Sequence, residues 1–177
     1  KLSQFKNDWY TPGKGKFIQL LWYVTSSMIF NSYLLPAYGI KTKLLRLFGA
    51  SIGSNVLIKP KVNIKYPWKL TIGSDVWIGE KVWIDNLGDV SIGNDVCISQ
   101  GAFLLTGNHN YKKDGFDLMV GEIIIEDKVW IGAQTTVCPG VTCKTGSILA
   151  VGSVATTDLD ADMIYQGNPA IVKRKRY

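Results

Sequence analysis

The chain has 177 residues, of which 46% are hydrophobic and 19% are charged, and its formal net charge is +6. This length suits one folded domain with at most a small appendage, and the composition excludes a globally disordered chain. Its three cysteines, Cys97, Cys138 and Cys143, are too few for a disulfide framework, and no CxxC or CxxH pair offers a metal clamp. We therefore expect a protein of a reducing compartment, the cytoplasm, that requires no metal.

Residues 17–35 predict an amphipathic helix within an N-terminal helical cap over residues 1–50. One apolar stripe consists of Phe17, Leu20, Leu21, Val24, Met28 and Leu35, and Trp22, Ile29 and Tyr33 add further apolar surface. The segment approaches the length of a membrane span, but four polar residues interrupt it: Gln19, Ser26, Ser27 and Asn31. Packing on the protein or a sister subunit, contact with a membrane face, and a true span all remain open. A second short helix is predicted over residues 42–48, with Gly49 at its end.

From residue 52 onward, aliphatic residues recur every six positions. They are Ile52, Ile58, Ile64, Ile72, Ile78, Ile84, Ile92, Ile98, Leu104, Ile125, Ile131 and Val137, followed more weakly by Cys143, Leu149 and Ala155. A period of six fits neither an α-helix nor a simple alternating strand, but it fits short strands that meet at corners. Three such hexads close a triangular coil, with the aliphatic residues stacked in ladders inside and Gly, Asn or Asp at the corners. The pattern predicts an all-β solenoid over residues 51–157, with caps at both ends.

The chain's one histidine, His109, ends the hexad that begins at Leu104, immediately before a break in the repeat at about residues 110–124. A long loop adds nothing to the stability of a solenoid, and such loops are usually functional or disordered. Histidine is the natural general base near neutral pH. Direct transfer of an acetyl group from a thioester to a hydroxyl needs a base and oxyanion donors, but no acyl-enzyme. We predict that His109 is this base.

Asp85 and Asn86 lie at a corner of the repeat, one coil before His109. They are either plain corner residues or residues that bind an acceptor hydroxyl or orient the histidine. Asp117, in the loop, is a weaker candidate for the orienting role. The three cysteines lie on the repeat frame, so we expect them to pack rather than to act as nucleophiles.

After residue 157 the repeat ends, and residues 158–177 predict a C-terminal cap. The sequence GNPA at residues 167–170 predicts a turn, and Lys173, Arg174, Lys175 and Arg176 form a basic tail. This tail either keeps the end solvated, holds an anionic cofactor or approaches anionic lipid. Nucleic acid is not expected as a partner, because no stripe of basic residues interleaved with aromatics follows any one element.

Several motifs resemble those of the left-handed β-helix O-acetyltransferases, which include the maltose and galactoside acetyltransferases. They are TGNHN around His109, VWIGAQTTVCPGVT at residues 129–142, AVGSVATTDL at residues 150–159 and QGNPA at residues 166–170. The runs LLRLFGASIG, KYPWKL, WIGEKVWIDN and SQGAFLLTGNHNY resemble the colanic acid biosynthesis acetyltransferase family more closely still. The first match covers about residues 51–172, and the second extends into the N-terminal segment.

This resemblance implies a left-handed parallel coil, a homotrimer with active sites in grooves between subunits, and acetyl-CoA as co-substrate. The acceptor it implies is a sugar hydroxyl in exopolysaccharide or capsule biosynthesis, on a lipid-linked oligosaccharide at the membrane. The family's catalytic histidine falls on His109, and its groove tryptophan falls on Trp130. The positions that contact CoA fall on Ala133, Val151, Thr156, Thr157, Pro169 and Arg174.

The sequence also departs from the galactoside enzymes. Thr157 stands where they carry lysine, and Ile171 stands where a basic residue is frequent, so Lys173 and Arg174 are the expected phosphate contacts. Their acceptor-binding asparagine aligns near Gly79 and Glu80, which makes Asn86 the candidate to replace it.

Three other functions compete with this interpretation. A zinc carbonic anhydrase on the same solenoid needs three histidine ligands, and the chain has one histidine. A non-catalytic solenoid that serves as a binding module leaves the loop and His109 unexplained. An acyltransferase for an amino sugar or another small acceptor remains open.

Overall fold

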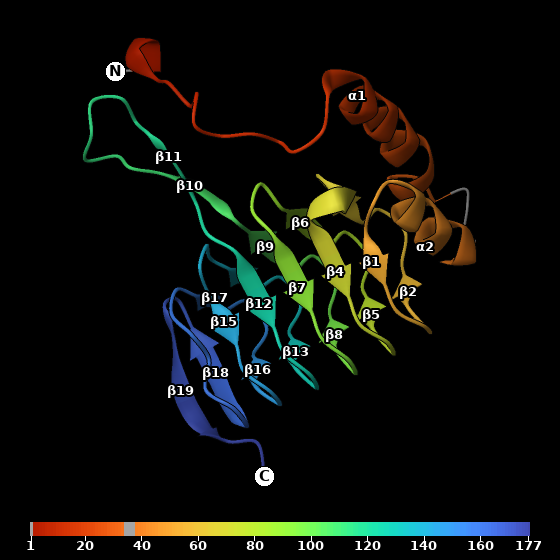
Figure 1. The fold of residues 1–177 in the computed structure, drawn as a ribbon. Helices are drawn as coiled ribbons and strands as arrows, with labels where there is room; N and C mark the ends of the chain where they lie inside the picture. Colours follow the sequence, from red (N-terminus) through yellow and green to blue (C-terminus); the bar gives the residue numbers. More distant parts are fainter. Residues whose placement is uncertain (1, 34–37) are drawn as a thin grey trace.

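The computed structural model describes residues 2–33 and 38–177, and its body is a parallel β-solenoid. The described chain forms five complete triangular coils, each with one strand on each of three faces. Figure 1 shows that the coils advance in a left-handed sense from the N-terminal helices towards the C-terminal hairpin. The fold class predicted from the six-residue period is confirmed.

Each face of the solenoid is a parallel sheet, extended on one face by a C-terminal hairpin. Sheet A consists of β1 (Ser51–Ile52), β4 (Leu70–Ile72), β7 (Val90–Ile92), β12 (Ile123–Ile125) and β15 (Thr142–Cys143). Sheet B begins with β2 (Leu57–Ile58), β5 (Trp77–Ile78), β8 (Cys97–Ile98), β13 (Trp130–Ile131) and β16 (Ile148–Leu149). Sheet C consists of β3 (Asn63–Ile64), β6 (Trp83–Asp85), β9 (Phe103–Leu105), β14 (Thr136–Val137) and β17 (Val154–Ala155).

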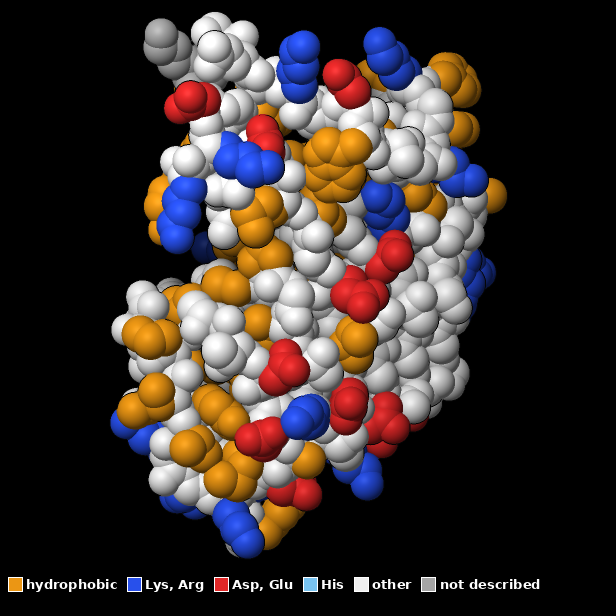
Figure 2. Space-filling model, turned by 60° about the vertical axis from the view of Figure 1, so that its left-hand side comes forward, with side chains coloured by type: hydrophobic (Ala, Val, Ile, Leu, Met, Phe, Trp, Pro, Cys, Tyr) orange, Lys and Arg blue, Asp and Glu red, His pale blue; other side chains and the backbone are white. Residues whose placement is uncertain are grey.

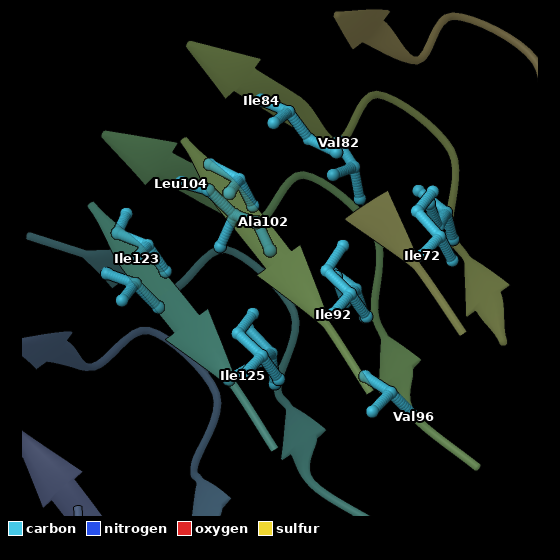
Figure 3. Close-up of a cluster of buried hydrophobic side chains, with 14 of the residues drawn as sticks. Ile72, Val82, Ile84, Ile92, Val96, Ala102, Leu104, Ile123 and Ile125 are labelled. Carbon is cyan, nitrogen blue, oxygen red and sulfur yellow. The ribbon is translucent and has the colours of Figure 1, made fainter. Parts of the chain in front are cut away.

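The aliphatic residues of the repeat stack inside the coil, as Figure 3 shows for its middle. Strand registers place equivalent residues over one another, for example Ile72 over Ile92 and Ile92 over Ile125. These side chains are almost completely buried, and between them lies a second set of valines such as Val76 and Val96. The ladder therefore forms one continuous hydrophobic core along the axis.

The glycines that follow the buried aliphatic residues are required for close packing between coils. A Cβ atom on Gly79 would lie 2.7 Å from the backbone nitrogen of Gln100 in the next coil, so this position requires close approach rather than positive φ. Positive φ at the corners falls on other residues: Asn55, Asp75 and Asp95, with φ of 53°, 60° and 55°, and glycines such as Gly101 and Gly140, with φ of 67° and 83°. Short polar side chains tolerate this conformation best among non-glycine residues.

The N-terminal segment packs across the first coils. It contains η1 (Leu2–Gln4), α1 (Lys16–Thr25), a π-helical turn η2 (Ser26–Phe30) and α2 (Tyr38–Leu47), and η3 (Pro67–Lys69) follows the first coil. The second helix begins earlier than predicted, and Gly49 ends it with φ of +100°. No helix within residues 2–33 and 38–177 is long and apolar enough to cross a membrane.

The apolar stripe predicted from the sequence lies on the outer face of α1 and η2. Phe17 and Met28 are 75% and 67% exposed, whereas Trp22 is 3% exposed and Phe30 is fully buried. Trp22 also donates a hydrogen bond from Nε1 to the Ile64 carbonyl at 2.9 Å. The opposite face therefore packs on the solenoid, because it carries both the large aromatics and this donor. Leu35, the last member of the predicted stripe, lies outside the described residues.

Three of the four C-terminal basic residues, Lys173, Arg174 and Lys175, belong to a strand and are exposed to solvent there. Strand β18 (Met163–Gly167) pairs in parallel with β16, and β19 (Ala170–Lys175) folds back antiparallel on β18. The predicted turn at residues 167–170 joins the two strands. Basic side chains are scattered over the face in Figure 2 and do not gather there into one broad patch.

The break in the repeat is a second hairpin. Strands β10 (Gly107–His109) and β11 (Leu118–Val120) pair antiparallel, with His109 opposite Leu118. Figure 1 shows this hairpin extending away from the coil, towards the chain's N-terminal residues. The coil resumes at β12, in register with β7.

The core ladder predicts a sharp contrast between adjacent positions of one strand. Ile72→Ala should lower the free energy of unfolding by about 2–5 kcal/mol, because it leaves a cavity between two coils. Thr71→Ala is the matched control, since Thr71 lies on the exposed side of the same strand, and it should change stability by less than about 0.5 kcal/mol. Equal losses in urea denaturation of the two variants would contradict the stacked core.

Candidate functional site

His109 lies half-buried at the end of β10, between two aromatic rings. Its ring stacks on Phe116 with centroids 4.3 Å apart and an interplanar angle of 7°, and Phe5 meets it edge-on at 5.6 Å. His109 Nδ1 lies 2.9 Å from the Phe116 carbonyl oxygen. Because a carbonyl can only accept, Nδ1–H donates, and the neutral ring then has its lone pair on Nε2. The geometry suits Nε2 to act as a general base.

The backbone of Phe116 is unusual at this contact. Its φ is +51°, a backbone conformation that residues other than glycine, asparagine and aspartate rarely adopt. Its amide is held by the Lys113 carbonyl at 2.9 Å. Strained residues of this kind concentrate at functional sites, where the surrounding structure imposes them. Here the strained residue contributes both the ring that stacks on His109 and the carbonyl that fixes its tautomer.

The residues proposed from the sequence to orient His109 do not contact it. Asp117 forms an ion pair with Lys113 at 3.2 Å, and its backbone carbonyl accepts from the Asn110 amide. The orienting group is therefore the Phe116 carbonyl. A backbone acceptor has no signature in the side-chain sequence, so the sequence analysis could not identify it.

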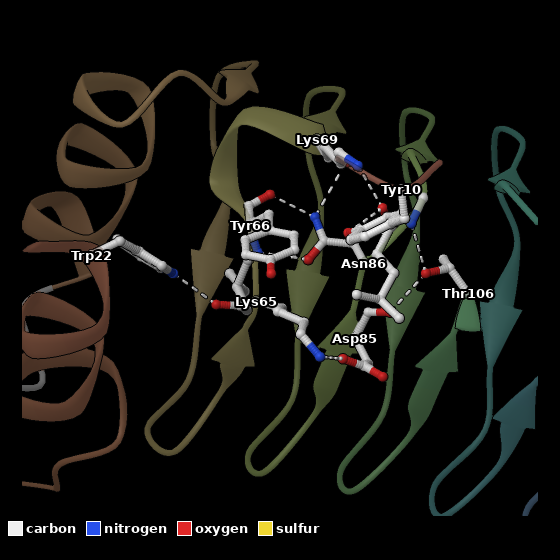
Figure 4. Close-up of polar contacts among 11 residues, drawn as sticks. Tyr10, Trp22, Lys65, Tyr66, Lys69, Asp85, Asn86 and Thr106 are labelled. Atoms are coloured by element: carbon white, nitrogen blue, oxygen red, sulfur yellow. Dashed lines mark hydrogen bonds and ion pairs between the residues drawn. The ribbon is translucent and has the colours of Figure 1, made fainter. Parts of the chain in front are cut away.

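Asn86 is a corner residue, which was one of the two interpretations left open. Its side chain is fully buried and forms three hydrogen bonds with backbone groups: it accepts from the Tyr66 amide and donates to the Tyr66 and Lys69 carbonyls. Figure 4 shows this amide enclosed between two coils. A side chain so placed cannot meet an acceptor hydroxyl, so the substrate-binding role expected for Asn86 is not supported.

Asp85 lies at the same corner but faces a cavity. Its Oδ1 accepts from Lys65 Nζ at 2.9 Å, and its backbone carbonyl accepts from Thr106 Oγ1 at 2.7 Å. Thr106 lies three residues before His109 (Figure 4). Asp85 therefore connects the corner with the start of the hairpin that carries the histidine.

A second feature missed by the sequence analysis is the extended chain before α1. Tyr10 donates its hydroxyl to the Leu87 carbonyl, and the Pro12 carbonyl accepts from Trp68 Nε1. Burial, and then the neighbouring Tyr66, raise the pKa of the Tyr10 hydroxyl, so it remains a neutral donor. These contacts bring the chain to the hairpin, where Phe5 reaches His109. The segment has no periodicity that would have revealed its course.

A cavity of about 630 Å³ lies on the outer side of sheet B. Its lining includes three of the residues expected to contact CoA, Ala133, Val151 and Arg174, together with Trp130, which was expected beside the substrate groove. Trp130 is held by a hydrogen bond from its Nε1 to Ser99 Oγ at 2.9 Å. Arg176 also lines the cavity, whereas Lys173 does not. Arg174 and Arg176 are alternate residues of an extended segment, so they point to the same side.

Thr156, Thr157 and Pro169 do not line this cavity. Thr156 and Thr157 follow β17 on sheet C, and Pro169 is in the turn between β18 and β19. The cavity thus combines an apolar floor with two arginines at one end, which suits an elongated ligand that has an apolar arm and anionic groups.

Two of the three cysteines, Cys138 and Cys143, lie in surroundings that disfavour a thiolate. Burial raises the pKa of Cys143 to about 12, and burial also raises the pKa of Cys138, so these thiols stay protonated and unreactive. Within the described parts of the chain, no three His, Cys, Asp or Glu side chains cluster so as to hold a metal ion.

The comparisons with known proteins agree with the fold. Over 156 residues the chain is 40% identical to the provisionally named colanic acid biosynthesis acetyltransferase WcaF of Escherichia coli K12, covering 88% of this chain and 86% of WcaF. The hexapeptide-repeat acetyltransferase of Vibrio cholerae matches with a TM-score of 0.80 at 24% identity, over 93% of this chain and 95% of that one. A galactoside acetyltransferase in complex with coenzyme A matches with a TM-score of 0.80 at 22% identity, over 91% and 82% of the two chains. No family model matches the chain.

Proposed function

Because the chain belongs to the family of the colanic acid biosynthesis acetyltransferases, we propose that it transfers the acetyl group of acetyl-CoA to a sugar hydroxyl during exopolysaccharide or capsule synthesis. The observation that carries this proposal is the fixed tautomer of His109, whose Nδ1–H is engaged by the Phe116 carbonyl. Nε2 is thereby left as an acceptor for a hydroxyl proton.

In the proposed reaction, Nε2 of His109 removes the proton of the sugar hydroxyl as its oxygen attacks the carbonyl carbon of the thioester. The carbon–sulfur bond of the tetrahedral intermediate then breaks, and the proton passes from His109 to the departing sulfur. The products are an acetyl ester of the sugar and free CoA thiol. Neither a metal ion nor an acyl-enzyme takes part.

Acetyl-CoA is proposed to occupy the cavity on sheet B. Its pantetheine arm would lie along Trp130, Ala133 and Val151, and its phosphates would meet Arg174 and Arg176. The galactoside relative was solved with coenzyme A, and the Vibrio cholerae relative with acetyl coenzyme A, which supports a CoA ligand on this solenoid. Thr156, Thr157 and Pro169, outside the cavity, are proposed to reach the cofactor from a neighbouring subunit's side of the groove.

A trimeric assembly is proposed because the two halves of the site lie on different faces of one chain. His109 is on the hairpin of β10 and β11, which follows strand β9 of sheet C, whereas the cofactor cavity is on sheet B. No described residue of this hairpin lines the cavity. In a closed ring, the hairpin of one copy can meet the cavity of the next. Each of three equivalent grooves would then contain one base and one cofactor.

The outer face of α1 is proposed to contact the cytoplasmic side of a membrane. Phe17, Leu20 and Met28 are exposed there together with Leu21 and Val24. Lys14 and Lys16 are exposed at the start of the same helix. Apolar side chains flanked by lysines suit an anionic lipid surface, and each lysine near that surface contributes about 1 kcal/mol. Such contact would bring the groove to a lipid-linked oligosaccharide.

The role of the base predicts a large loss of turnover without loss of fold. His109→Ala should lower kcat by on the order of 10²–10⁴, because the hydroxyl then has no base. Lys112→Ala, an exposed position in the same hairpin, is the control and should retain wild-type kcat. Turnover is measured as thiol release from acetyl-CoA with a panel of sugars. Near-wild-type kcat in His109→Ala would remove the residue from the mechanism.

The shared groove predicts that two inactive variants complement each other. Val151→Trp should fill the cofactor cavity, and His109→Ala should remove the base. Subunits mixed in equal amounts and reassembled should regain roughly a quarter of wild-type activity, because that fraction of grooves combines an intact base with an intact cavity in a closed ring. Light scattering should give the mass of a trimer. Activity that stays absent after verified mixing would place both functions in one subunit.

Membrane contact predicts selective binding to anionic vesicles. The intact chain should sediment with phosphatidylglycerol-containing liposomes at low salt and much less with phosphatidylcholine alone. The double variant Phe17→Ser, Met28→Ser should lose this binding, since both side chains lie on the exposed face. Tyr111→Ser, at an equally exposed aromatic of the hairpin, should bind like wild type. If all three proteins bind anionic vesicles equally, α1 is not the contact.

A further inference from the structure

Residues 2–9 form a strap outside the solenoid, and one of its side chains rests on the proposed base. Seven of these eight residues are exposed to solvent, and the apolar Leu2 and Trp9 are 76% and 60% exposed. Phe5 is the exception: it is half-buried, and its ring centroid lies 5.6 Å from that of His109. The strap is therefore not a general apolar cover, because its larger aromatic, Trp9, is left in solvent while Phe5 lies against the imidazole.

The strap is anchored to the solenoid just after it ends. Three hydrogen bonds hold this anchor: the Tyr10 hydroxyl donates to the Leu87 carbonyl at 3.1 Å, Lys69 Nζ to the Thr11 carbonyl at 3.2 Å, and Trp68 Nε1 to the Pro12 carbonyl at 2.6 Å. Their partners on the solenoid belong to η3 and to the corner after β6. The strap is thus attached to the coils and not to the hairpin that it contacts.

The backbone of the strap is folded locally on its way to the hairpin. The Phe5 amide donates to the Leu2 carbonyl at 3.1 Å, and the Tyr10 amide donates to the Asn7 carbonyl at 2.8 Å. The Gln4 carbonyl oxygen passes the hairpin loop, 3.8 Å from the place that a Cβ on Gly115 would take. These turns hold Phe5 over the loop without any strand pairing.

The hairpin that carries His109 is short. Strands β10 and β11 share three residue pairs, and His109 with Leu118 is the pair next to the loop. Figure 1 shows the hairpin reaching away from the coil towards the N-terminal residues. A two-stranded hairpin is only marginally stable by itself in water. A contact from outside the hairpin therefore matters for holding a catalytic side chain at its end.

Phe5 holds the imidazole independently of Phe116. Phe116 provides both the acceptor for Nδ1–H and the ring that stacks on the imidazole, so these two contacts move together with the hairpin loop. Phe5 meets the imidazole at an interplanar angle of 61° and belongs to a segment attached to the solenoid. Contacts from two separate segments restrict the tilt of the ring more than either contact does. This precision matters because misplacing a reacting group by about 1 Å can reduce the rate about 10²-fold.

We propose that Phe5 is a positioning residue for His109, and that the strap serves to bring it there. This inference rests on the proposed role of His109 as the base. Phe5 keeps the imidazole against Phe116, so that Nδ1–H retains its hydrogen bond and Nε2 retains its direction. Phe5 takes no part in the proton transfer and acts only through His109.

The kinetics of strap variants test this role. Phe5→Ala should lower kcat for sugar acetylation by about 10- to 100-fold, because the base is no longer held in place. The KM for acetyl-CoA should not change, since no described residue of the strap lines the cofactor cavity. Phe5→Tyr keeps the ring and should retain most of the wild-type kcat. Leu2→Ala, at an exposed apolar position of the same strap, is the control and should have wild-type kcat.

Magnetic resonance of the imidazole gives a readout that a merely structural role would not move. The chain has one histidine, so isotope-labelled histidine reports on His109 alone. At mildly alkaline pH, where an ordinary imidazole is neutral, the nitrogen shifts of the wild type and of Leu2→Ala should show the proton on Nδ1. Those of Phe5→Ala should move towards an average of the two tautomers. Its Tm should equal that of the wild type, because the core ladder is untouched.

Wild-type kcat with unchanged nitrogen shifts in Phe5→Ala would overturn the positioning role. A raised KM for the sugar with unchanged kcat would also overturn it, because Phe5 would then be a substrate contact. If turnover is lost in His109→Ala but complete in Phe5→Ala, the role of Phe5 fails and the proposed function stands. Wild-type turnover in His109→Ala would instead overturn the proposed function, and the nitrogen shifts would still show whether Phe5 holds the ring.

Discussion

Three carbonyl groups of the first coil have no preceding coil to donate to them. The amide that follows a strand donates to a carbonyl of the next coil, as Gly53 does to Ile72, whereas corner amides such as that of Asp75 donate back to the preceding coil. The equivalent carbonyls of the first coil, those of Ile52, Ile58 and Ile64, therefore need donors from outside the repeat. The N-terminal segment provides one donor for each face: Arg46 to the Ile52 carbonyl, Lys41 Nζ to the Ile58 carbonyl, and Trp22 Nε1 to the Ile64 carbonyl. Burial lowers the pKa of the Lys41 amine, because the charged form is disfavoured away from water. The hydrogen bond to the Ile58 carbonyl offsets part of this cost.

This requirement also determines how the N-terminal segment lies against sheet C. Trp22 can reach the Ile64 carbonyl only if α1 crosses the edge of sheet C, and that crossing leaves a groove between the helix and Trp83. The extended chain before α1 then runs along the second and third coils to the hairpin, where Phe5 contacts His109. The cap of the solenoid and one wall of the site are therefore the same segment.

The sequence predicts most of the solenoid because burial repeats at fixed positions, and residues such as Ile92 and Leu104 can stack only one way. It also locates His109, since a break in so regular a pattern is conspicuous. It fails where the deciding group is polar or belongs to the backbone. Both faces of α1 are apolar, and a single indole donor decides which one is buried. The alternation that places Arg174 and Arg176 together appears only once the tail is known to be a strand.

The two halves of the proposed site differ in how firmly the fold holds them. The cavity that contains Trp130 rests on sheet B, where the strand that carries Trp130, β13, is bonded to β8 on one side and to β16 on the other. His109 instead depends on a short two-stranded hairpin and on a strained Phe116, and its neighbour Phe5 comes from an extended segment. Changes in the hairpin or in α1 can alter the acceptor side without disturbing the core ladder or the cofactor cavity. A solenoid of this kind can therefore keep one acyl donor while its acceptor changes, because the residues that would recognise each belong to structurally independent elements.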